Sequence, residues 1–476
     1  MSTEPVAASP VPHTAFEDKV GHPPGLFFLF FTEMWERFSY YGMRGLLVLY
    51  MVNYLFVSSR QVAQGSSQTI AGDPTQVLGL HAIRTGLESI FGHLEIQPLS
   101  SQIYGLYTGL VYLTPVLGGY FADRFLGQRK TVYIGGAFMA IGHFLMASEK
   151  MFFLALLFLI IGNGFFKPNI STQVGSLYPE GDHRRDRAFS IFYVGINLGA
   201  FLSNLVCGTL AAVYGWHWGF GAAGVGMMVG LVVYAIGQRH LAPDNVMKRQ
   251  QSHADKAADK LTAAEWRRVL ALCALCGLNI VFWAVYEQQG NTMQLWADQQ
   301  TIWPTILGFT IPSTWFQSFN PLVIMAGTPL LIAFWAWQEK RKTEPSSVAK
   351  MAIGSVILGL SFLVMVVGAR VVGDEKGSMF WPLACTTMLT VGELYLSPVG
   401  LSLVTKVAPV RIVSLMMGVW FLSSFLGNYL SGVIGSFYAL MPKEVFFMML
   451  TMLGVATGLA MWAFNKPLKR ALGHEV

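Results

Sequence analysis

Charged residues are scarce in this chain of 476 residues: they make up 12%, whereas hydrophobic residues make up 53%. Soluble proteins carry about 25% charged residues, so this composition excludes an ordinary soluble domain. The short alternating segments of an outer-membrane barrel are also missing. Apolar runs of roughly 20 residues recur instead, and a run of that length crosses a bilayer as a helix. We therefore predict an all-α integral membrane protein embedded in the lipid bilayer.

Cysteine and clusters of metal ligands are also scarce. Cys273 and Cys276 form a CxxC, but no second pair or ligand cluster accompanies it, which favours thiols packed between helices. No helix shows an HxxxH spacing, and no nucleophile with a general base is apparent. We therefore predict no metal, no cofactor and no enzymatic activity. The net charge of +6 does not require nucleic acid as a partner, because basic residues of membrane proteins gather in cytoplasmic loops.

Twelve apolar segments are long enough to span a bilayer. A long polar gap at 238–265 separates the first six from the last six. We therefore predict one bundle over 25–237, a cytoplasmic linker over 238–265 and a second bundle over 266–465, with tails at 1–24 and 466–476. The segments are 25–57, 101–122, 130–148, 151–172, 188–210, 213–237, 266–289, 320–338, 350–370, 379–405, 411–437 and 444–465.

Lysine and arginine indicate the orientation of these segments. If the N-terminus lies inside, the inside loops and the linker hold most of the basic residues and the outside loops hold few. Because cytoplasmic loops are enriched in Lys and Arg, we predict that both termini lie in the cytoplasm and that the protein resides in the cell inner membrane. The polar residues 1–24 show no apolar core or cleavage site, so the first spanning helix is expected to direct insertion.

The outer loop at 58–100 is long for a connection between two spanning helices. Asp73-Pro74 has the form of an N-cap followed by proline at the first helical position. The apolar residues that follow recur at helical spacing, which predicts an amphipathic helix on the membrane surface or over the outer face of the protein. These residues are Leu80, Ile83, Leu87, Ile90, Phe91 and Leu94.

The first spanning segment contains EMWERFSYYG at residues 33–42. At about 100° per residue, Glu36, Arg37, Tyr40 and Arg44 fall within about 60° of Glu33. A charge at the centre of a bilayer is costly, so this stripe is predicted to face a protein interior or a watery cavity. The alternative is a buried ion-pair network that only holds the bundle together.

Other spanning segments are also interrupted by polar residues. Together with the stripe they supply four acids (Glu33, Glu36, Glu287 and Glu393) and three bases (Arg37, Arg44 and Lys167). One acid therefore lacks a basic partner, and burial favours the protonated form of an unpaired acid. The set predicts a proton carrier without identifying it. Further candidates in these segments are Asn197, Trp283, Asn320, Trp420 and Ser424.

Two short segments indicate an internal repeat. GNGFFKP at 162–168 and GELYLSP at 392–398 both begin with glycine and end with proline, and they lie in the fourth and tenth spanning segments. Equivalent positions in two halves of six segments are typical of a duplicated transporter.

A loop motif, GGYFADRFLGQRK, follows the second spanning segment at 118–130. Asp123 is predicted to cap the N-terminus of a neighbouring helix, while Arg124 and Arg129 complement helix C-termini. This arrangement predicts a structural latch on the cytoplasmic side.

These motifs resemble those of a known family. GxxADRxxGxRK resembles the loop motif of the major facilitator superfamily. ExxERFxYYG at 33–42, FSIFYVGINLGAF at 189–201 and GELYLSPVG at 392–400 resemble the first-, fifth- and tenth-helix motifs of proton-dependent oligopeptide transporters. The resemblance implies the major facilitator fold, with twelve transmembrane helices in two six-helix bundles around a cavity. It also implies import of di- and tripeptides with protons, and no obligate protein partner.

The resemblance further implies roles for individual residues. Arg37 and Lys167 would hold the peptide carboxylate, and Glu393 with Asn197 and Asn320 would hold the amino group. Proton coupling would use Glu33, Glu36 and Arg37, with Glu287; Arg44 and Glu287 would pair as an outer gate. The side-chain pockets would be lined by Tyr40, Tyr41, Tyr112, Trp283, Trp420 and Ser424.

The sequence departs from relatives at two places. The linker 238–265 is too polar and too short to hold the two extra helices of many bacterial members, and Gly105 replaces an early histidine of animal members. The second change leaves carboxylates as the candidate proton carriers. A transporter of nitrate or another small anion, a peptide receptor that does not transport, and a membrane enzyme are the alternatives; the intact ExxER acids argue against the first.

Overall fold

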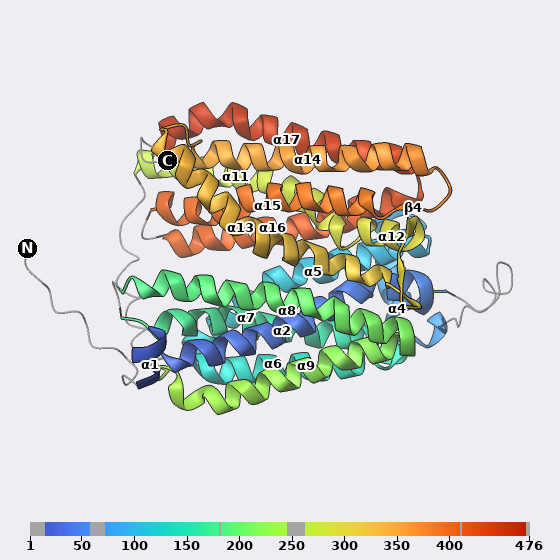
Figure 1. Ribbon diagram of the computed structural model, residues 1–476, viewed down its shortest axis with the longest axis horizontal. Helices are drawn as coiled ribbons and strands as arrows, with labels where there is room; N and C mark the ends of the chain where they lie inside the picture. Colours follow the sequence, from blue (N-terminus) through green and yellow to red (C-terminus); the bar gives the residue numbers. More distant parts are fainter. Residues whose placement is uncertain (1–14, 58–71, 180–181, 245–261, 410–411, 473–476) are drawn as a thin grey trace, which may run out of the picture. The chain divides into compact units, whose positions relative to one another are not determined.

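The computed structural model describes residues 15–57, 72–179, 182–244, 262–409 and 412–472, and helices dominate these ranges (Figure 1). Parts of three predicted segments lie outside the described residues: 1–14 of the tail 1–24, 58–71 of the outer loop 58–100 and 245–261 of the linker 238–265.

Each of the twelve predicted segments corresponds to one long helix, which confirms the all-α prediction. Nine of the described helices are long and apolar enough to cross a membrane on length and composition. The charged α2 is not among them. The twelve are α2 (Pro24–Tyr50), α5 (Ile96–Phe121), α6 (Gln128–Leu145), α7 (Phe152–Ser176), α8 (Arg184–Tyr214), α9 (Trp216–Gly237), α11 (Ala263–Tyr286), α13 (Phe316–Lys340), α14 (Ser347–Val372), α15 (Phe380–Val407), α16 (Val413–Gly435) and α17 (Lys443–Leu472).

Shorter elements connect or extend the long helices. A π-helical turn, η1 (Met51–Leu55), continues α2, and another, η3 (Ala122–Leu126), follows α5. Strand β1 (Thr301–Ile302) pairs in parallel with β4 (Gly377–Ser378), and β2 (Thr305–Ile306) pairs antiparallel with β3 (Phe309–Thr310). The remaining elements are α1 (Ala15–Val20), η2 (Pro74–Gln76), α4 (Leu80–Phe91), η4 (Glu149–Met151), η5 (Gln238–His240), η6 (Glu287–Gln289), α12 (Thr292–Gln299), η7 (Ser313–Trp315) and η9 (Ser436–Ala439).

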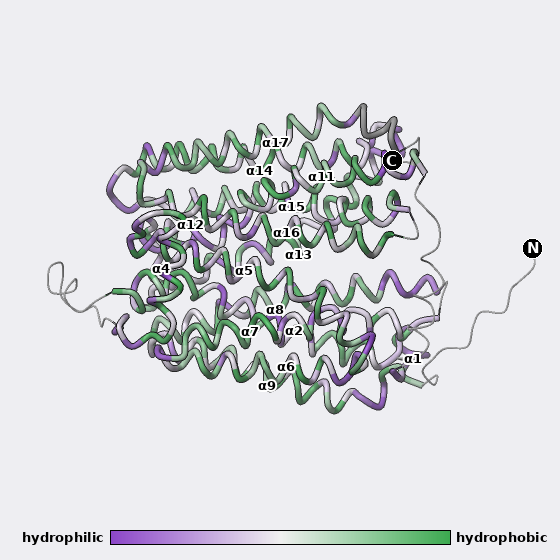
Figure 2. Tube along the Cα trace, turned by 180° about the vertical axis from the view of Figure 1, so that it is seen from behind, coloured by the Kyte–Doolittle hydropathy of each residue, from purple (hydrophilic) through white to green (hydrophobic). Residues whose placement is uncertain are grey.

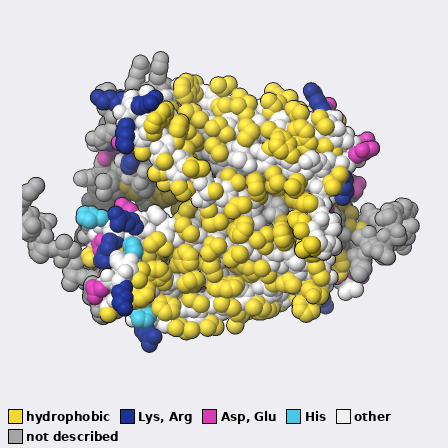
Figure 3. Space-filling model, in the orientation of Figure 1, with side chains coloured by type: hydrophobic (Ala, Val, Ile, Leu, Met, Phe, Trp, Pro, Cys, Tyr) yellow, Lys and Arg dark blue, Asp and Glu magenta, His cyan; other side chains and the backbone are white. Residues whose placement is uncertain are grey.

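Apolar side chains cover the middle of the helices in each unit of the chain, and charged side chains gather near the helix ends. Figure 2 shows this along the backbone, where hydrophobic colouring dominates the helices and hydrophilic colouring concentrates in the connections. Figure 3 shows the same distribution on one face: Lys and Arg cluster at the ends of the helices. This is the pattern of helices whose middle lies in hydrocarbon.

The chain divides into two compact units, and the division does not follow the two sequence halves. The first unit comprises 1–46 and 113–256, and the second comprises 47–112 and 257–476. The end of α2 and the first half of α5 thus belong with the C-terminal helices. The predicted bundle boundaries, 25–237 and 266–465, describe the sequence repeat and stay a prediction.

Close backbone contact explains why the start of α5 belongs to the second unit. A Cβ atom on Gly105 would lie 2.6 Å from the Cα atom of Gly432 on α16, which only glycine permits. Ser101 Oγ donates a 2.8 Å hydrogen bond to Asn291 Oδ1. Gln97 Nε2 donates to the carbonyl of Gly435 at 3.0 Å. Buried polar atoms satisfied in this way fix the register between helices.

The internal repeat is visible in how two helix pairs pack. A Cβ on Gly162 of α7 would lie 2.7 Å from the carbonyl oxygen of Gly135 on α6, and a Cβ on Gly392 of α15 would lie 2.6 Å from that of Gly354 on α14. The first glycine of each repeated segment therefore has the same structural role: it allows its helix to pack closely against the preceding helix. The terminal prolines of the two segments also lie inside α7 and α15.

The outer loop contains the predicted helix, but its start differs from the prediction. Asp73 accepts a 3.0 Å hydrogen bond from the Thr75 amide, and hydrogen bonds from Thr75 and Gln76 lower the pKa of its carboxyl. However, Asp73 caps only the short turn η2, and α4 begins separately at Leu80. Within α4 the predicted apolar stripe is incompletely covered: Leu87 is buried, whereas Ile90 is 72% exposed.

Gly199 allows α8 to contact the charged part of α2. A Cβ at this position would lie 2.1 Å from the carbonyl oxygen of Met34 and 3.0 Å from the amide nitrogen of Phe38. Neither backbone atom can move without distorting α2, so the site tolerates no side chain. This contact encloses one side of the turn that contains Glu33, Glu36 and Arg37.

We expect Gly199→Ala to destabilise the protein by about 1–3 kcal/mol, because it overpacks a helix contact. The matched control is Gly277→Ala in α11, where a Cβ would meet nothing within 4 Å and where alanine favours the helix. Thermal unfolding in detergent measures both variants. Equal unfolding temperatures for the two would contradict this account of the α2–α8 contact.

Candidate transport site

The centre of the candidate site in the first unit is Arg37. Its Nε is bonded to Glu36 Oε2, and its Nη2 donates to Glu36 Oε1 at 2.5 Å, so the two side chains form a bidentate pair. Glu33, one turn earlier, lies 3.3 Å from Arg37 Nε through its Oε1 atom. The three side chains are at most 2% exposed. The predicted stripe on α2 is therefore buried within the protein.

The two carboxylates are not equivalent. Both oxygens of Glu36 contact the guanidinium, and Asn163 Nδ2 of α7 approaches Oε1 at 3.5 Å. Glu33 Oε2, by contrast, is buried with no hydrogen-bond partner among the described residues. A buried carboxylate oxygen without a partner is costly as an anion, so Glu33 is the less fully satisfied of the two carboxylates.

Lys167 on α7 joins this charged group. It is half-buried, and it interacts electrostatically with Glu33, Glu36, Arg37 and Arg44. Two cationic side chains, Lys167 and the Arg37 guanidinium, thus belong to one group in the first unit. A cation pair of this kind can bind an anionic group such as a carboxylate.

Aromatic rings of α2 lie beside the charges. The Arg37 guanidinium carbon lies 5.1 Å from the centre of the Tyr40 ring, within cation–π range. The Arg44 guanidinium carbon lies 6.0 Å from the centre of the Tyr41 ring, and the two tyrosine rings pack edge to face. The predicted stripe thus forms a continuous set of charged and aromatic groups along α2.

The second unit contains an acidic counterpart around Glu393. Tyr286, the last residue of α11, donates its hydroxyl to Glu393 Oε2 on α15 at 2.5 Å. Asn320 Nδ2 on α13 donates to Thr390 Oγ1 at 2.8 Å and to the Tyr286 hydroxyl at 3.3 Å. Three helices therefore hold Glu393 and Asn320 in one network, as the sequence predicts for these two residues.

The remaining predicted pocket residues of the second unit are mostly enclosed. The Trp283 ring packs edge to face on Tyr286 at 5.3 Å between centroids. Trp420 is 4% exposed, and its ring lies where a side chain on Gly400 of α15 would have to be. The Ser424 hydroxyl donates to the Trp420 carbonyl at 3.4 Å. Trp420 and Ser424 therefore share one helix face, as predicted; their role in a pocket stays a prediction.

Several predicted pairings involve residues of both units and stay predictions. Arg44 belongs to the first unit and Glu287 to the second, so the outer gate is untested. Asn197 Nδ2 donates to the Tyr193 carbonyl of its own helix at 3.0 Å; it belongs to the first unit, unlike Glu393 and Asn320. Tyr112 is the last residue of the segment 47–112 in the second unit.

The helix that follows the predicted latch motif is capped by an acidic residue from outside the motif. The amides of Gln128 and Arg129, at the start of α6, donate to the carboxylate of Asp244 at 3.2 and 3.0 Å. Asp244 therefore caps this helix. Arg129 Nη2 donates to the carbonyls of Leu241 and Ala242, which follow η5. The predicted capping role of Asp123 and the predicted role of Arg129 at a helix C-terminus stay predictions.

Arg124 of the same motif contacts α5, and its predicted role at a helix C-terminus stays a prediction. Its Nη1 donates to the Tyr120 hydroxyl at 2.8 Å. No local sequence pattern identifies Tyr286, Thr390 or Asp244 as a partner of these residues. Tyr286 adjoins Glu287 in the sequence, but only the packing of α11 against α13 and α15 reveals its contacts. No group of three or more His, Cys, Asp or Glu within the described ranges could hold a metal ion.

Comparison with known proteins decides the family. A family model described as "POT family" matches residues 129–249 and 241–452. The chain belongs to the POT family. Its POT relatives include "Peptide transporter YePEPT" of Yersinia enterocolitica, 32% identical over 87% of this chain and 88% of the relative. A "Di-/tripeptide transporter" of Lactococcus lactis is 31% identical over 95% of this chain and 97% of the relative.

Solved structures of POT proteins share the fold. A mutant peptide transporter POT in complex with alafosfalin superposes with a TM-score of 0.81 at 31% identity, covering 97% of this chain and 98% of that one. A POT family transporter in complex with 5-aminolevulinic acid gives 0.78 at 26% identity, covering 96% and 99%. The chain is therefore a multi-pass membrane transporter of the major facilitator fold and not an enzyme.

We expect Glu36→Gln to destabilise the protein more than Glu33→Gln. Glu36 supplies both contacts of the bidentate pair, and loss of one partner of a buried ion pair costs about 3–5 kcal/mol. Glu33 supplies one 3.3 Å contact and has an unsatisfied oxygen. Thermal unfolding of the two variants without added peptide measures the difference. The reverse order would show that the two carboxylates are assigned wrongly.

Proposed function

We propose that this POT protein imports di- and tripeptides together with protons by alternating access across the cell inner membrane, with both termini in the cytoplasm. Its relatives in Yersinia enterocolitica and Lactococcus lactis, a peptide transporter and a di-/tripeptide transporter, support the peptide substrate. The observation that carries the proposal is that the two units supply different partners for a peptide: the cations Arg37 and Lys167 in the first unit and the acid Glu393 in the second. A peptide zwitterion needs one of each.

The carboxylate of the peptide binds to Arg37 and Lys167. Glu36 engages Nε and Nη2 of Arg37, which leaves Nη1 as the donor for a ligand. Lys167 adds a second cation to the same group. Charge-assisted hydrogen bonds from these groups are stronger than neutral ones. They select a free carboxylate over an amide, which has no negative charge.

The amino group of the peptide binds to Glu393, with Asn320 and Asn197 as further polar contacts. Tyr286 orients the carboxylate through its 2.5 Å hydrogen bond. A carboxylate offers about four acceptor positions on its two oxygens, so Glu393 can accept from an ammonium group in addition to Tyr286. Aromatic walls supplied by Tyr40, Tyr41, Tyr112, Trp283 and Trp420, with Ser424, accept varied side chains without selecting one.

Glu33 carries the coupled proton in the first unit. Its unsatisfied oxygen favours the neutral acid, and deprotonation gives Arg37 a second full anionic partner at 3.3 Å. The charge on Glu33 therefore changes how strongly Arg37 attracts a peptide carboxylate. Glu36 stays paired and holds the arginine in place. Glu287, 2% exposed at the end of α11, is a second proton site that pairs with Arg44 as the outer gate.

Labelled dialanine should accumulate in proteoliposomes that contain this protein when the proton gradient is directed inward. Glu33→Gln should abolish that accumulation but keep counterflow exchange, because glutamine preserves shape and cannot release a proton. Uptake without a proton gradient, with and without trapped dialanine, separates the two activities. Accumulation by Glu33→Gln at the wild-type level would remove Glu33 as the carrier.

Dialanine that binds without crossing the membrane would support a receptor. Nitrate that moves while dialanine does not would support an anion transporter. Either result would overturn the proposed function, and both can be measured with the same proteoliposomes.

The ligand polarity can be tested with blocked peptides. Glu393→Gln should weaken dialanine binding by at least tenfold and N-acetyl-dialanine hardly at all, because the acetylated peptide brings no cation to that carboxylate. Lys167→Gln should weaken dialanine strongly and dialanine amide little. Competition binding at one pH measures each variant with free and blocked dialanine. Comparing the losses of affinity in such a cycle separates the loss of one ligand contact from general damage to the binding site. Equal losses for free and acetylated peptide in Glu393→Gln would require the polarity to be withdrawn.

A further inference from the structure

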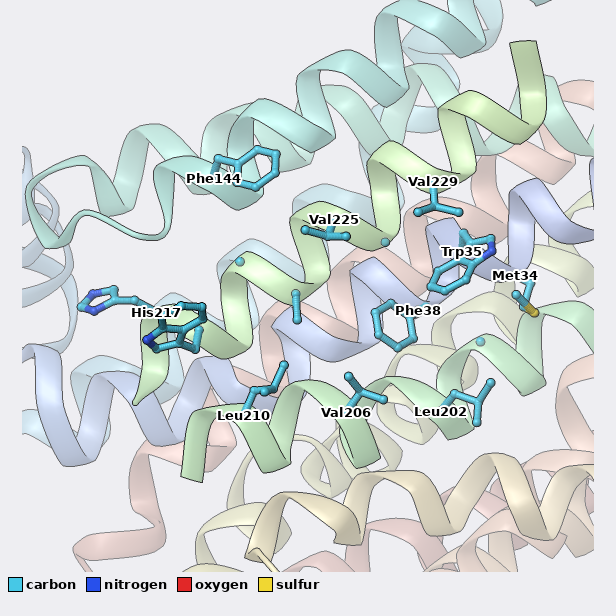
Figure 4. Close-up of a pocket in the computed structure, with 15 residues that line it drawn as sticks. Met34, Trp35, Phe38, Phe144, Leu202, Val206, Leu210, His217, Val225 and Val229 are labelled. Atoms are coloured by element: carbon cyan, nitrogen blue, oxygen red, sulfur yellow. The ribbon is translucent and has the colours of Figure 1, made fainter. Parts of the chain in front are cut away.

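An apolar groove lies on the side of α2 away from its charges, within the first unit. It has a volume of about 640 Å³, and α2, α8 and α9 form its walls, with Phe144 of α6 at one edge. Figure 4 shows Trp35 and Phe38 of α2 at one end and His217 of α9 at the other, with Leu202, Val206 and Leu210 of α8 along one wall. This volume falls within the range of about 300–1,000 Å³ typical of small-molecule sites.

Two glycines of α9 shape the groove in different ways. A Cβ on Gly226 would lie 2.6 Å from the Phe38 ring, so this glycine brings α9 against α2. A Cβ on Gly221 would meet nothing within 4 Å. The missing side chain at 221 therefore leaves space that no neighbouring residue fills. Larger residues at this position would fill that space without a clash.

The groove is open, and its surface matches hydrocarbon rather than water. Val206 is 43% exposed and Val225 is 57% exposed, although both lie in helices that span the membrane. Its lining offers almost no polar atoms with which a water-soluble ligand could form hydrogen bonds. Trp218, 64% exposed in the first turn of α9, and His217 place amphipathic rings at one end. Such rings are enriched where a bilayer meets water.

We propose that this groove binds one acyl chain of a bilayer phospholipid, with its headgroup near His217 and Trp218. Between apolar protein and lipid there is no hydrophobic gain, so binding depends on van der Waals packing. A concave surface contacts a chain on several sides and therefore holds it more strongly than a flat helix face does. The inference rests on the membrane-spanning fold and does not depend on the proposed peptide transport.

The position of the groove connects the lipid to the charged turn. Trp35 and Phe38 line the groove, while Glu33, Glu36 and Arg37 alternate with them on the opposite side of the same turns. An acyl chain in the groove would support the back of this turn. Phe38 is only 6% exposed, so the chain would add to the protein contacts that already hold these two rings.

The test compares retained lipid in three proteins that are reconstituted in vesicles of palmitoyl-oleoyl phosphatidylcholine and phosphatidylethanolamine and then extracted in maltoside. Native mass spectrometry counts the phospholipids that remain after extended washing. The wild type should retain one phospholipid, and Gly221→Phe should reduce the retained fraction at least fivefold, because the phenyl ring fills the groove. Gly277→Phe, which adds the same ring where a Cβ meets nothing within 4 Å, should retain lipid like the wild type.

Three results would overturn the proposal: no phospholipid on the wild type, equal retention by Gly221→Phe and the wild type, or retention of detergent alone. A complex of two protein chains that Gly221→Phe abolishes would also overturn it, because a second copy would then occupy this groove. Gly221→Ala should keep the lipid, since a methyl group leaves most of the groove open. If Gly221→Phe does not fold, Val225→Trp fills the same groove from the next turn of α9, and its expected loss of lipid is the same.

Discussion

The bidentate ion pair between Arg37 and Glu36 is the constraint on which the first unit depends. An arginine that is 2% exposed can persist in a spanning helix only if carboxylates neutralise it and protein encloses it. The close contact at Gly199 provides part of that enclosure, and Asn163 provides a polar neighbour. The pair also determines the difference between the two acids, because Glu36 satisfies the guanidinium and leaves Glu33 partly unsatisfied.

α2 has two faces with opposite requirements. Its charged face needs polar partners, whereas the face with Trp35 and Phe38 lines an apolar groove. The turns of α2 that contain the ion pairs therefore also contain the two aromatic residues of the groove. In the second unit, the Tyr286 hydroxyl donates to Glu393 Oε2, and Asn320 donates to the Tyr286 hydroxyl. Neutral groups of α11 and α13 therefore belong to the network around this carboxylate.

Hydropathy and helical periodicity predicted much of this molecule because they report properties that a single segment has alone. The twelve helices, the buried stripe on α2 and the repeated glycines at 162 and 392 are all of this kind. Partners contributed by a distant segment were missed. Asp244 caps α6 from 116 residues away, and Tyr286 reaches Glu393 across 107 residues; no local pattern records such pairs. Asp73 has the sequence pattern of a helix N-cap, but the helix that it caps is the short turn η2 and not α4.

Two helices pass from one compact unit to the other, α2 between Leu46 and Leu47 and α5 between Tyr112 and Leu113. Each has an irregularity just beyond that point: the π-turn Met51–Leu55 follows α2, and Pro115 interrupts the hydrogen bonds of α5. A regular helix is stiff, and π-turns and prolines are where helices bend. The two irregularities are therefore the points at which α2 and α5 bend most easily, and both lie close to the places where the chain leaves one unit for the other.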